Sequence, residues 1–229
     1  MKKIDFLVIL LVIIALAPFF IFSDVYEAYK NFNAAHPLVM AFFKFGLLAT
    51  FGEMLGLRIK TGKYNAPGFG LAPRAVVWGL LGMWIALSMS VFKNGIPAFL
   101  EQYTIFKGVK EAMYTDFSLL KLCGAFFISV MMNTSFAPVF MTLHKITDAH
   151  ILQNGGKLTA LLKPISVGKI ISELNWKVQW GFVFKKTIPL FWIPAHTLTF
   201  ILPGDFQVLF AAFCSIILGL ILSIASLKK

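Results

Sequence analysis

The chain has 229 residues, of which 59% are hydrophobic and only 14% are charged, and 21 basic against 10 acidic residues give a formal net charge of +11. Soluble domains carry roughly 25% charged residues, and a helix that spans a membrane needs about 20 mostly apolar residues. Several apolar runs of that length occur here, so the composition argues against a soluble protein.

The first apolar run covers residues 5–22 and follows Lys2 and Lys3. Its small-x-small triplet, residues 15–17, is similar to a signal-peptidase site, but Pro18 comes directly after it. Proline is unfavourable at that position, so we predict an uncleaved N-terminal anchor helix, with a cleaved signal peptide as the alternative.

Five further apolar segments follow, at residues 37–57, 74–98, 118–143, 180–203 and 205–227. Because lipid offers no partner for bare backbone polar groups, each must be helical. The sequence therefore predicts an all-α, polytopic transmembrane helix bundle of about six spans, forming one integral membrane domain over residues 1–229. The segment 180–203 is the least regular, because two lysines and several prolines interrupt it, and we expect it to be tilted or kinked.

The basic residues are sorted between the connecting regions. With the N-terminus inside, 15 of the 21 basic residues lie on the inner side, and five acidic residues balance the five lysines of the outer side. This asymmetry predicts that both termini are cytoplasmic. We therefore interpret the excess positive charge as a signal that orients the helices in the membrane and as an attraction to an anionic lipid bilayer. We expect no nucleic-acid partner.

The longest loop, residues 145–179, is predicted to be cytoplasmic. Within it, residues 157–174 place leucines and isoleucines at near-helical spacing between lysines, which is typical of an amphipathic element on a membrane surface. Pro164 should break or kink any helix there. A plain solvated linker is the alternative. Gly68 and Gly70, in the preceding basic loop, are interpreted as a flexible connector.

Small residues recur at four-residue spacing in two segments, a pattern by which helices pack closely in lipid. We predict helix contacts, within the chain first and in a homo-oligomer as the alternative, at Gly46, Gly52, Gly56, Ala211, Ser215, Gly219 and Ser223.

Polar side chains at membrane depth are costly, by roughly 3 kcal/mol or more for an ionisable group. The candidates for a polar path are Glu53, Asn133, His196 and Gln207. Each has a simpler interpretation: Glu53 can reach the interface or pair with Arg58 or Lys60, and Asn133 and His196 can bond between helices. Motifs for catalysis, for phosphate loops or for metal ligands are missing from the sequence, so we predict no enzyme, no cofactor and no metal.

The C-terminal hairpin carries a run of residues that resembles a known signature: Phe191-Trp192-Ile193-Pro194-Ala195-His196, then Leu202-Pro203-Gly204-Asp205-Phe206-Gln207-Val208, ending at Leu222-Ser223. Earlier fragments agree in order and spacing: His36-Pro37, Gly46, Gly52-Glu53, Phe136-Ala137-Pro138 and Asn175-Trp176-Lys177-Val178. Over residues 34–226 the chain resembles the family of the mitochondrial inner-membrane protein Mpv-seventeen and the twenty-two-kilodalton peroxisomal membrane protein, with the helix at 5–22 as an addition.

The resemblance implies a multi-span membrane protein, and some family members are reported to form channels for small solutes. Several polar family positions differ here: the family arginine of the closing signature is Gln207, and the pair before Phe136 is Met132-Asn133. The short Lys-Lys start favours a bacterial cytoplasmic membrane, with a mitochondrial or peroxisomal membrane if the source is eukaryotic. We expect a channel or transporter for a small solute, and a non-transporting scaffold or assembly partner as the alternative.

Overall fold

The computed structural model describes residues 2–226, without the side chains of residues 222, 223, 225 and 226. These residues form helices and connecting turns and contain no strand, which confirms the all-α prediction. The chain divides into two compact units, Met1–Met40 and Ala41–Lys229, and each is described by itself.

The first unit consists of α1 (Lys3–Ile21) and α2 (Ser23–Ala35). Helix α1 is apolar on every side and none of its side chains is buried, as expected for a helix whose surroundings are lipid. Phe22 has an extended backbone and separates the two helices, and the rings of Phe19 and Tyr29 pack edge to face at 5.6 Å.

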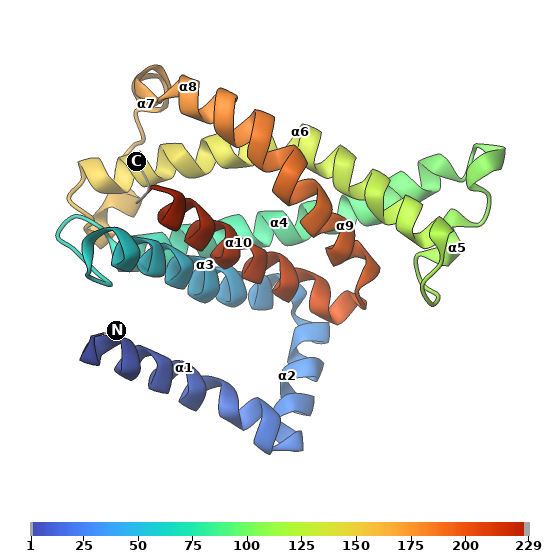
Figure 1. Ribbon diagram of the computed structural model, residues 1–229, viewed down its shortest axis with the longest axis horizontal. Helices are drawn as coiled ribbons and strands as arrows, with labels where there is room; N and C mark the ends of the chain where they lie inside the picture. Colours follow the sequence, from blue (N-terminus) through green and yellow to red (C-terminus); the bar gives the residue numbers. More distant parts are fainter. Residues whose placement is uncertain (1, 227–229) are drawn as a thin grey trace. The chain divides into compact units, whose positions relative to one another are not determined.

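The second unit contains the greater part of α3 (Pro37–Thr61), followed by α4 (Leu71–Leu100), α6 (Leu119–Gln153), α9 (Ile193–Ile201) and α10 (Gly204–Ser226). Within this unit α3, α4, α6 and α10 run alongside one another (Figure 1). Shorter elements connect them: η1 (Thr104–Phe106), α5 (Val109–Ala112), η2 (Leu158–Leu162), α7 (Val167–Glu173), α8 (Trp176–Val178) and η3 (Gln179–Trp192).

Among the described residues, five helices are long and apolar enough to cross a membrane: α1, α3, α4, α6 and α10. They match five of the six predicted segments. The remaining segment, 180–203, is divided between the π-helix η3, 14 residues long, and α9. Pro189 lies inside η3; because proline has no N–H, an α-helical hydrogen-bond ladder cannot run through it intact.

The predicted amphipathic segment 157–174 forms two short pieces rather than one helix. The 3₁₀-helix η2 and the helix α7 flank Pro164, and they bury Ala160 and Ile170 against the unit. Leu158 and Leu162 are 56% and 88% exposed. Apolar side chains therefore remain on the surface of this loop, between its lysines.

The core of the second unit lies between α3, α4, α6, α9 and α10. Phe45, Ile128, Met132 and Phe200 are at most 2% exposed and pack in one cluster with Ile85. These closely packed apolar side chains lie between the polar groups at the Glu53 end of α3 and α4 and those near Lys93.

Close helix contacts are made through glycine on α3. A Cβ on Gly46 would lie 3.0 Å from the carbonyl oxygen of Ala75 on α4, and one on Gly52 would lie 3.1 Å from the Cα of Ile216 on α10. Gly219 faces the backbone of Gly52. The small residues on α3 and α10 thus meet within the chain.

The other small residues singled out in the sequence lie as follows. Gly56 and Ala211 are buried, and Ser215 is half-buried with its hydroxyl donating to the Ala211 carbonyl at 3.3 Å. The side chain of Ser223 lies outside the described residues.

Candidate functional site

The first polar site is an ionic cluster where the end of α3, the start of α4 and the C-terminal half of α6 meet. Arg74 Nη1 lies 2.5 Å from Glu53 Oε2 and 2.6 Å from Asp148 Oδ1. The side chain of Arg74 is 11% exposed and those of the two carboxylates are each 20% exposed. A single guanidinium thus bridges two largely buried carboxylates contributed by different helices.

Two aromatic side chains complete the cluster around Glu53. Trp78 Nε1 donates to Glu53 Oε1 at 3.1 Å, and His144 Nε2 lies 3.2 Å from the same oxygen and 3.5 Å from Asp148 Oδ1. The Trp78 and His144 rings are 4.3 Å apart. His144 thus lies between the two carboxylates, on the same side of the cluster as the Trp78 ring.

The loop before α4 holds Arg74 in place. Its Nε donates to the Phe69 carbonyl at 2.7 Å, and its guanidinium stacks over the Phe69 ring at 4.7 Å. Gly70 has φ of 74°. Its backbone nitrogen lies close to Gly156, and a Cβ on Gly156 would be 2.7 Å from that nitrogen. The glycines interpreted as a flexible connector therefore form a fixed contact that positions the arginine.

Glu53, His144 and Asp148 also form a potential metal-ligand group. Their ligand atoms lie within 4.8 Å of one another, although the sequence motifs predicted no such set. Because the Arg74 guanidinium contacts both carboxylates, a cation could bind there only by displacing it. The geometry favours an ionic clamp between three helices.

The second polar site joins α6 to α9 in the interior. Asn133 is fully buried and its side-chain amide lies 2.9 Å from His196 Nδ1. Asn133 Nδ2 also donates to the Ser129 carbonyl at 2.9 Å, and the Ser129 hydroxyl donates to the Ile193 carbonyl at 2.7 Å. Trp192 stacks on the His196 ring at 5.1 Å. The Asn133–His196 and Ser129–Ile193 bonds join α6 to α9, so they fix the junction of η3 and α9 against α6.

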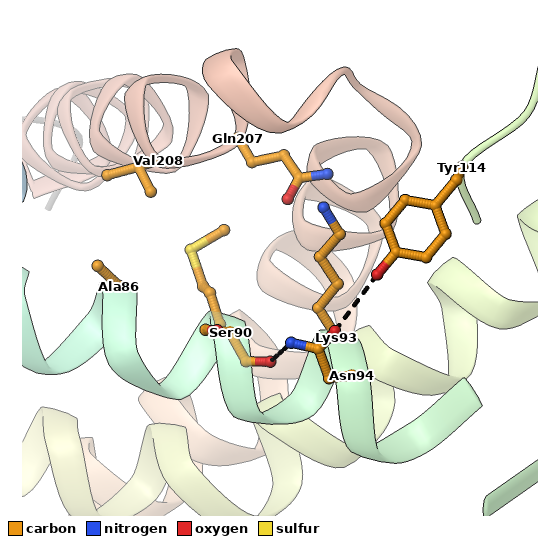
Figure 2. A pocket seen from close by; sticks show the side chains of 8 residues that line it. Ala86, Ser90, Lys93, Asn94, Tyr114, Gln207 and Val208 are labelled. Atoms are coloured by element: carbon orange, nitrogen blue, oxygen red, sulfur yellow. Dashed lines mark hydrogen bonds between the residues drawn. The ribbon is translucent and has the colours of Figure 1, made fainter. Parts of the chain in front are cut away.

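The third polar site is a cavity of about 270 Å³ between α4 and the start of α10. Figure 2 shows that Lys93 of α4 and Gln207 of α10 point toward one another there, with Tyr114 at the side. Gln207 is 6% exposed and its Nε2 donates to the Leu202 carbonyl at 2.8 Å. Ser90 and Asn94 are exposed, so the cavity opens at the surface.

The loop between α4 and α6, which carries Tyr114, is held by a carboxylate. Glu101 accepts hydrogen bonds from the backbone N–H groups of Gly108 at 2.8 Å and Lys110 at 3.1 Å. These bonds lower the pKa of Glu101 below its ordinary value of 4.5, and the bond from Gly108 has the larger effect. The Tyr114 hydroxyl in turn donates to Asn94 Oδ1 at 3.3 Å.

The four candidates for a polar path thus lie at three separate places. Glu53 belongs to the ionic cluster, Asn133 and His196 bond to each other, and Gln207 lines the cavity. Along α4, the buried Leu81 and Ile85 lie between the ionic cluster and the cavity. The sites are separated by packed apolar side chains.

Comparison with known proteins gives no further support: no family model, no curated protein and no solved structure matches the chain. The interpretation of the site rests on the chain's own geometry.

Sequence reasoning missed most of the ionic cluster. It singled out Glu53 but not Arg74, Trp78, His144 or Asp148. One signal was available: His144 and Asp148 are four residues apart, so they share a helix face. Arg74 had been counted only as a topogenic charge.

Proposed function

We propose that the protein is a six-span membrane transport protein for a small solute, with both termini in the cytoplasm. The observation that carries the proposal is the cavity between α4 and α10, whose floor of Met89 and Gln207 is buried while its rim is exposed. The cavity combines apolar walls with a few convergent polar groups, which is the pattern of a small-molecule site.

The lengths of the helices support this topology. Five are of spanning length, and α8, η3 and α9 form one uninterrupted helical rod from Trp176 to Ile201, which supplies the sixth span. With the N-terminus inside, the ionic cluster lies at the cytoplasmic end and the cavity at the outer end. The arrangement is that of a carrier open to the outside and closed inside.

This topology is tested by labelling single cysteines. In a chain whose Cys123 and Cys214 are replaced by alanine, a cysteine at exposed position Tyr103 should react with an impermeant maleimide from outside intact cells. A cysteine at exposed position Lys157 should react only after the membrane is opened. The reverse pattern would overturn the proposed orientation.

We also propose that the chain is a divergent member of the family that it resembles. The resembling motifs occupy structurally defined positions: Asn175 caps the rod by accepting from the Val178 amide at 3.1 Å, and Pro203 and Gly204 form the turn between α9 and α10. These three motif residues each have a local structural task, and this supports the resemblance.

The transport proposal is tested by flux into proteoliposomes. Ala86 lines the cavity and Ala98, on the same helix, is exposed. Uptake of small labelled solutes should exceed that of protein-free vesicles, should be blocked by Ala86→Trp, and should persist in the matched control Ala98→Trp. Folded protein with no flux above protein-free vesicles would overturn the proposal.

The alternative of a non-transporting scaffold rests on small-residue helix faces. On α3 and α10 these faces contact other helices of the same chain, so they offer less surface to a partner than the sequence suggested. A silent flux assay together with a stoichiometric cross-linked partner would favour the scaffold.

A further inference from the structure

Lys93 is the charged residue of the cavity. It is half-buried, and its ammonium lies 5.6 Å from the centre of the Tyr114 ring. Within the described part of the chain it has neither a carboxylate partner nor a hydrogen-bond acceptor at bonding distance. Aromatic contact compensates a buried cation only in part, so Lys93 has capacity for an anion.

The surroundings of Lys93 add positive rather than negative potential. Its charged neighbour is a second cation, Lys121, whose ammonium donates to the Thr115 carbonyl at 2.7 Å. The Lys93 ammonium also lies 3.7 Å from where a Cβ on Gly204 would be. Gly204 is the first residue of α10, and the N-terminus of a helix carries partial positive charge.

The nearest acidic side chain of that helix is engaged elsewhere. Asp205, in the first turn of α10, interacts electrostatically with Lys44 of α3, which is 7% exposed. Among the residues that line the cavity there is no carboxylate. An ammonium beside another cation and a positive helix end is stabilised when an anion binds between them.

We propose that this cavity, the Lys93 pocket, binds a small oxyanion. Lys93 supplies the charge, while Ser90, Asn94, Tyr114 and Gln207 supply polar groups around it (Figure 2). At about 270 Å³ the pocket is just below the range of small-molecule sites, roughly 300–1,000 Å³, which suits inorganic phosphate or a short carboxylate. The inference deepens the proposed function by naming the class of solute, and it rests on that function only for the claim that the anion is carried.

Binding is measured apart from transport, on the purified full-length protein in neutral detergent. Sodium phosphate or acetate should raise the unfolding temperature by about 2–4 °C at a few times the dissociation constant, relative to sodium chloride of equal ionic strength. Lys93→Met should weaken this response at least about tenfold, the loss expected for one charged hydrogen bond, and Lys93→Arg should restore part of it.

The matched control is Lys110→Met, because Lys110 is an exposed lysine of the same outer loop that does not line the pocket. It should keep the full response. Without anions, Lys93→Met should be as stable as the parent or more stable, because the substitution removes a cation from a positive environment; this result also shows that the variant folds.

The same oxyanion chemistry occurs in a lipid headgroup, so a second arm compares delipidated protein with and without phosphatidylglycerol. A Lys93-dependent response to phosphate or acetate alone identifies a soluble anion, and one that requires phosphatidylglycerol identifies a lipid phosphate. Equal responses of the Lys93→Met variant and the parent would overturn the site. Anion binding without flux would overturn the transport proposal and support the binding site. Flux without Lys93-dependent binding would overturn the binding site and support the transport proposal.

Discussion

Replacing Arg74 by methionine should destabilise the protein more than replacing either of its acidic partners. Arg74 Nη1 contacts Glu53 and Asp148 at 2.5 and 2.6 Å. For charge centres about 4 Å apart, the gross attraction of such a pair is about 4 kcal/mol at an effective dielectric constant of 20. Loss of the arginine leaves two carboxylates facing each other. Breaking a buried pair costs about 3–5 kcal/mol, and the 20% exposure of both carboxylates lowers our expectation to about 2–4 kcal/mol.

A double-mutant cycle separates the ionic clamp from ordinary packing. Glu53→Gln should cost only about 1 kcal/mol, since Arg74 keeps Asp148 and the amide oxygen still accepts from Trp78. The double variant should be no less stable than Arg74→Met alone, because removing the arginine then strands one carboxylate instead of two. Unfolding by dodecyl sulfate in mixed micelles, followed by tryptophan fluorescence, measures all three.

Lys145→Met is the matched control. Its ammonium lies 4.0 Å from Asp148 and its side chain is 51% exposed, so its loss should change stability by less than about 0.5 kcal/mol. Costs of Arg74→Met and Glu53→Gln that simply add, to within about 0.5 kcal/mol, would refute the clamp.

Three further predictions concern other parts of the chain. Glu101→Gln should lower the unfolding temperature above pH 4.5, and the difference from the parent should vanish as the pH falls through the depressed pKa of Glu101. The reason is that a carboxylate with a lowered pKa stabilises the fold only while it is ionised. A difference in unfolding temperature that does not depend on pH would contradict this. Gly82→Ala should cost about 1–3 kcal/mol of stability, because the added Cβ would overpack α4 against Phe45 of α3. Gly95→Ala, with nothing within 4 Å of the added carbon, should be neutral or stabilising by up to about 1 kcal/mol. Equal effects of the two substitutions in dodecyl sulfate unfolding would show that the Gly82–Phe45 contact does not stabilise the fold. Asn133→Leu should cost about 1–2 kcal/mol by removing bonds between helices, while Thr134→Ala, which loses bonds only within its own exposed turn, should cost almost nothing in the same assay.

The spanning helices could be predicted because their cause is local. Apolar length decides that a segment is helical in lipid, and the predicted segments 37–57 and 74–98 fall within α3 and α4. The helices extend beyond them: α6 runs on to Gln153, because Lys145 and Asp148 are compatible with a helix once it has left the hydrocarbon. Hydropathy marks the membrane and not the end of the helix.

The ionic cluster could be predicted only in part because its cause is long-range. Glu53 stood out as a charge in an apolar run, whereas Arg74 looked like one of many basic residues at a helix end. Its partners are 21 and 74 residues away in the sequence, and charge counting carries no information on pairing across that distance. The π-helical form of η3 was also missed, since its prolines predict a kink without specifying the hydrogen-bond spacing that results.

The arrangement of polar groups limits how such a protein can carry a solute. A static pore would need the Lys93 pocket to continue past Ile85 to the ionic cluster, but the core side chains between them are closely packed. The proposed transport would therefore require helices to separate at the cluster, where one arginine holds three of them, while the Asn133–His196 contact keeps α9 on α6. Because clamp and pocket are separated along α4, variants at Arg74 should lower stability without changing anion affinity, whereas variants at Lys93 should lower anion affinity without destabilising the fold.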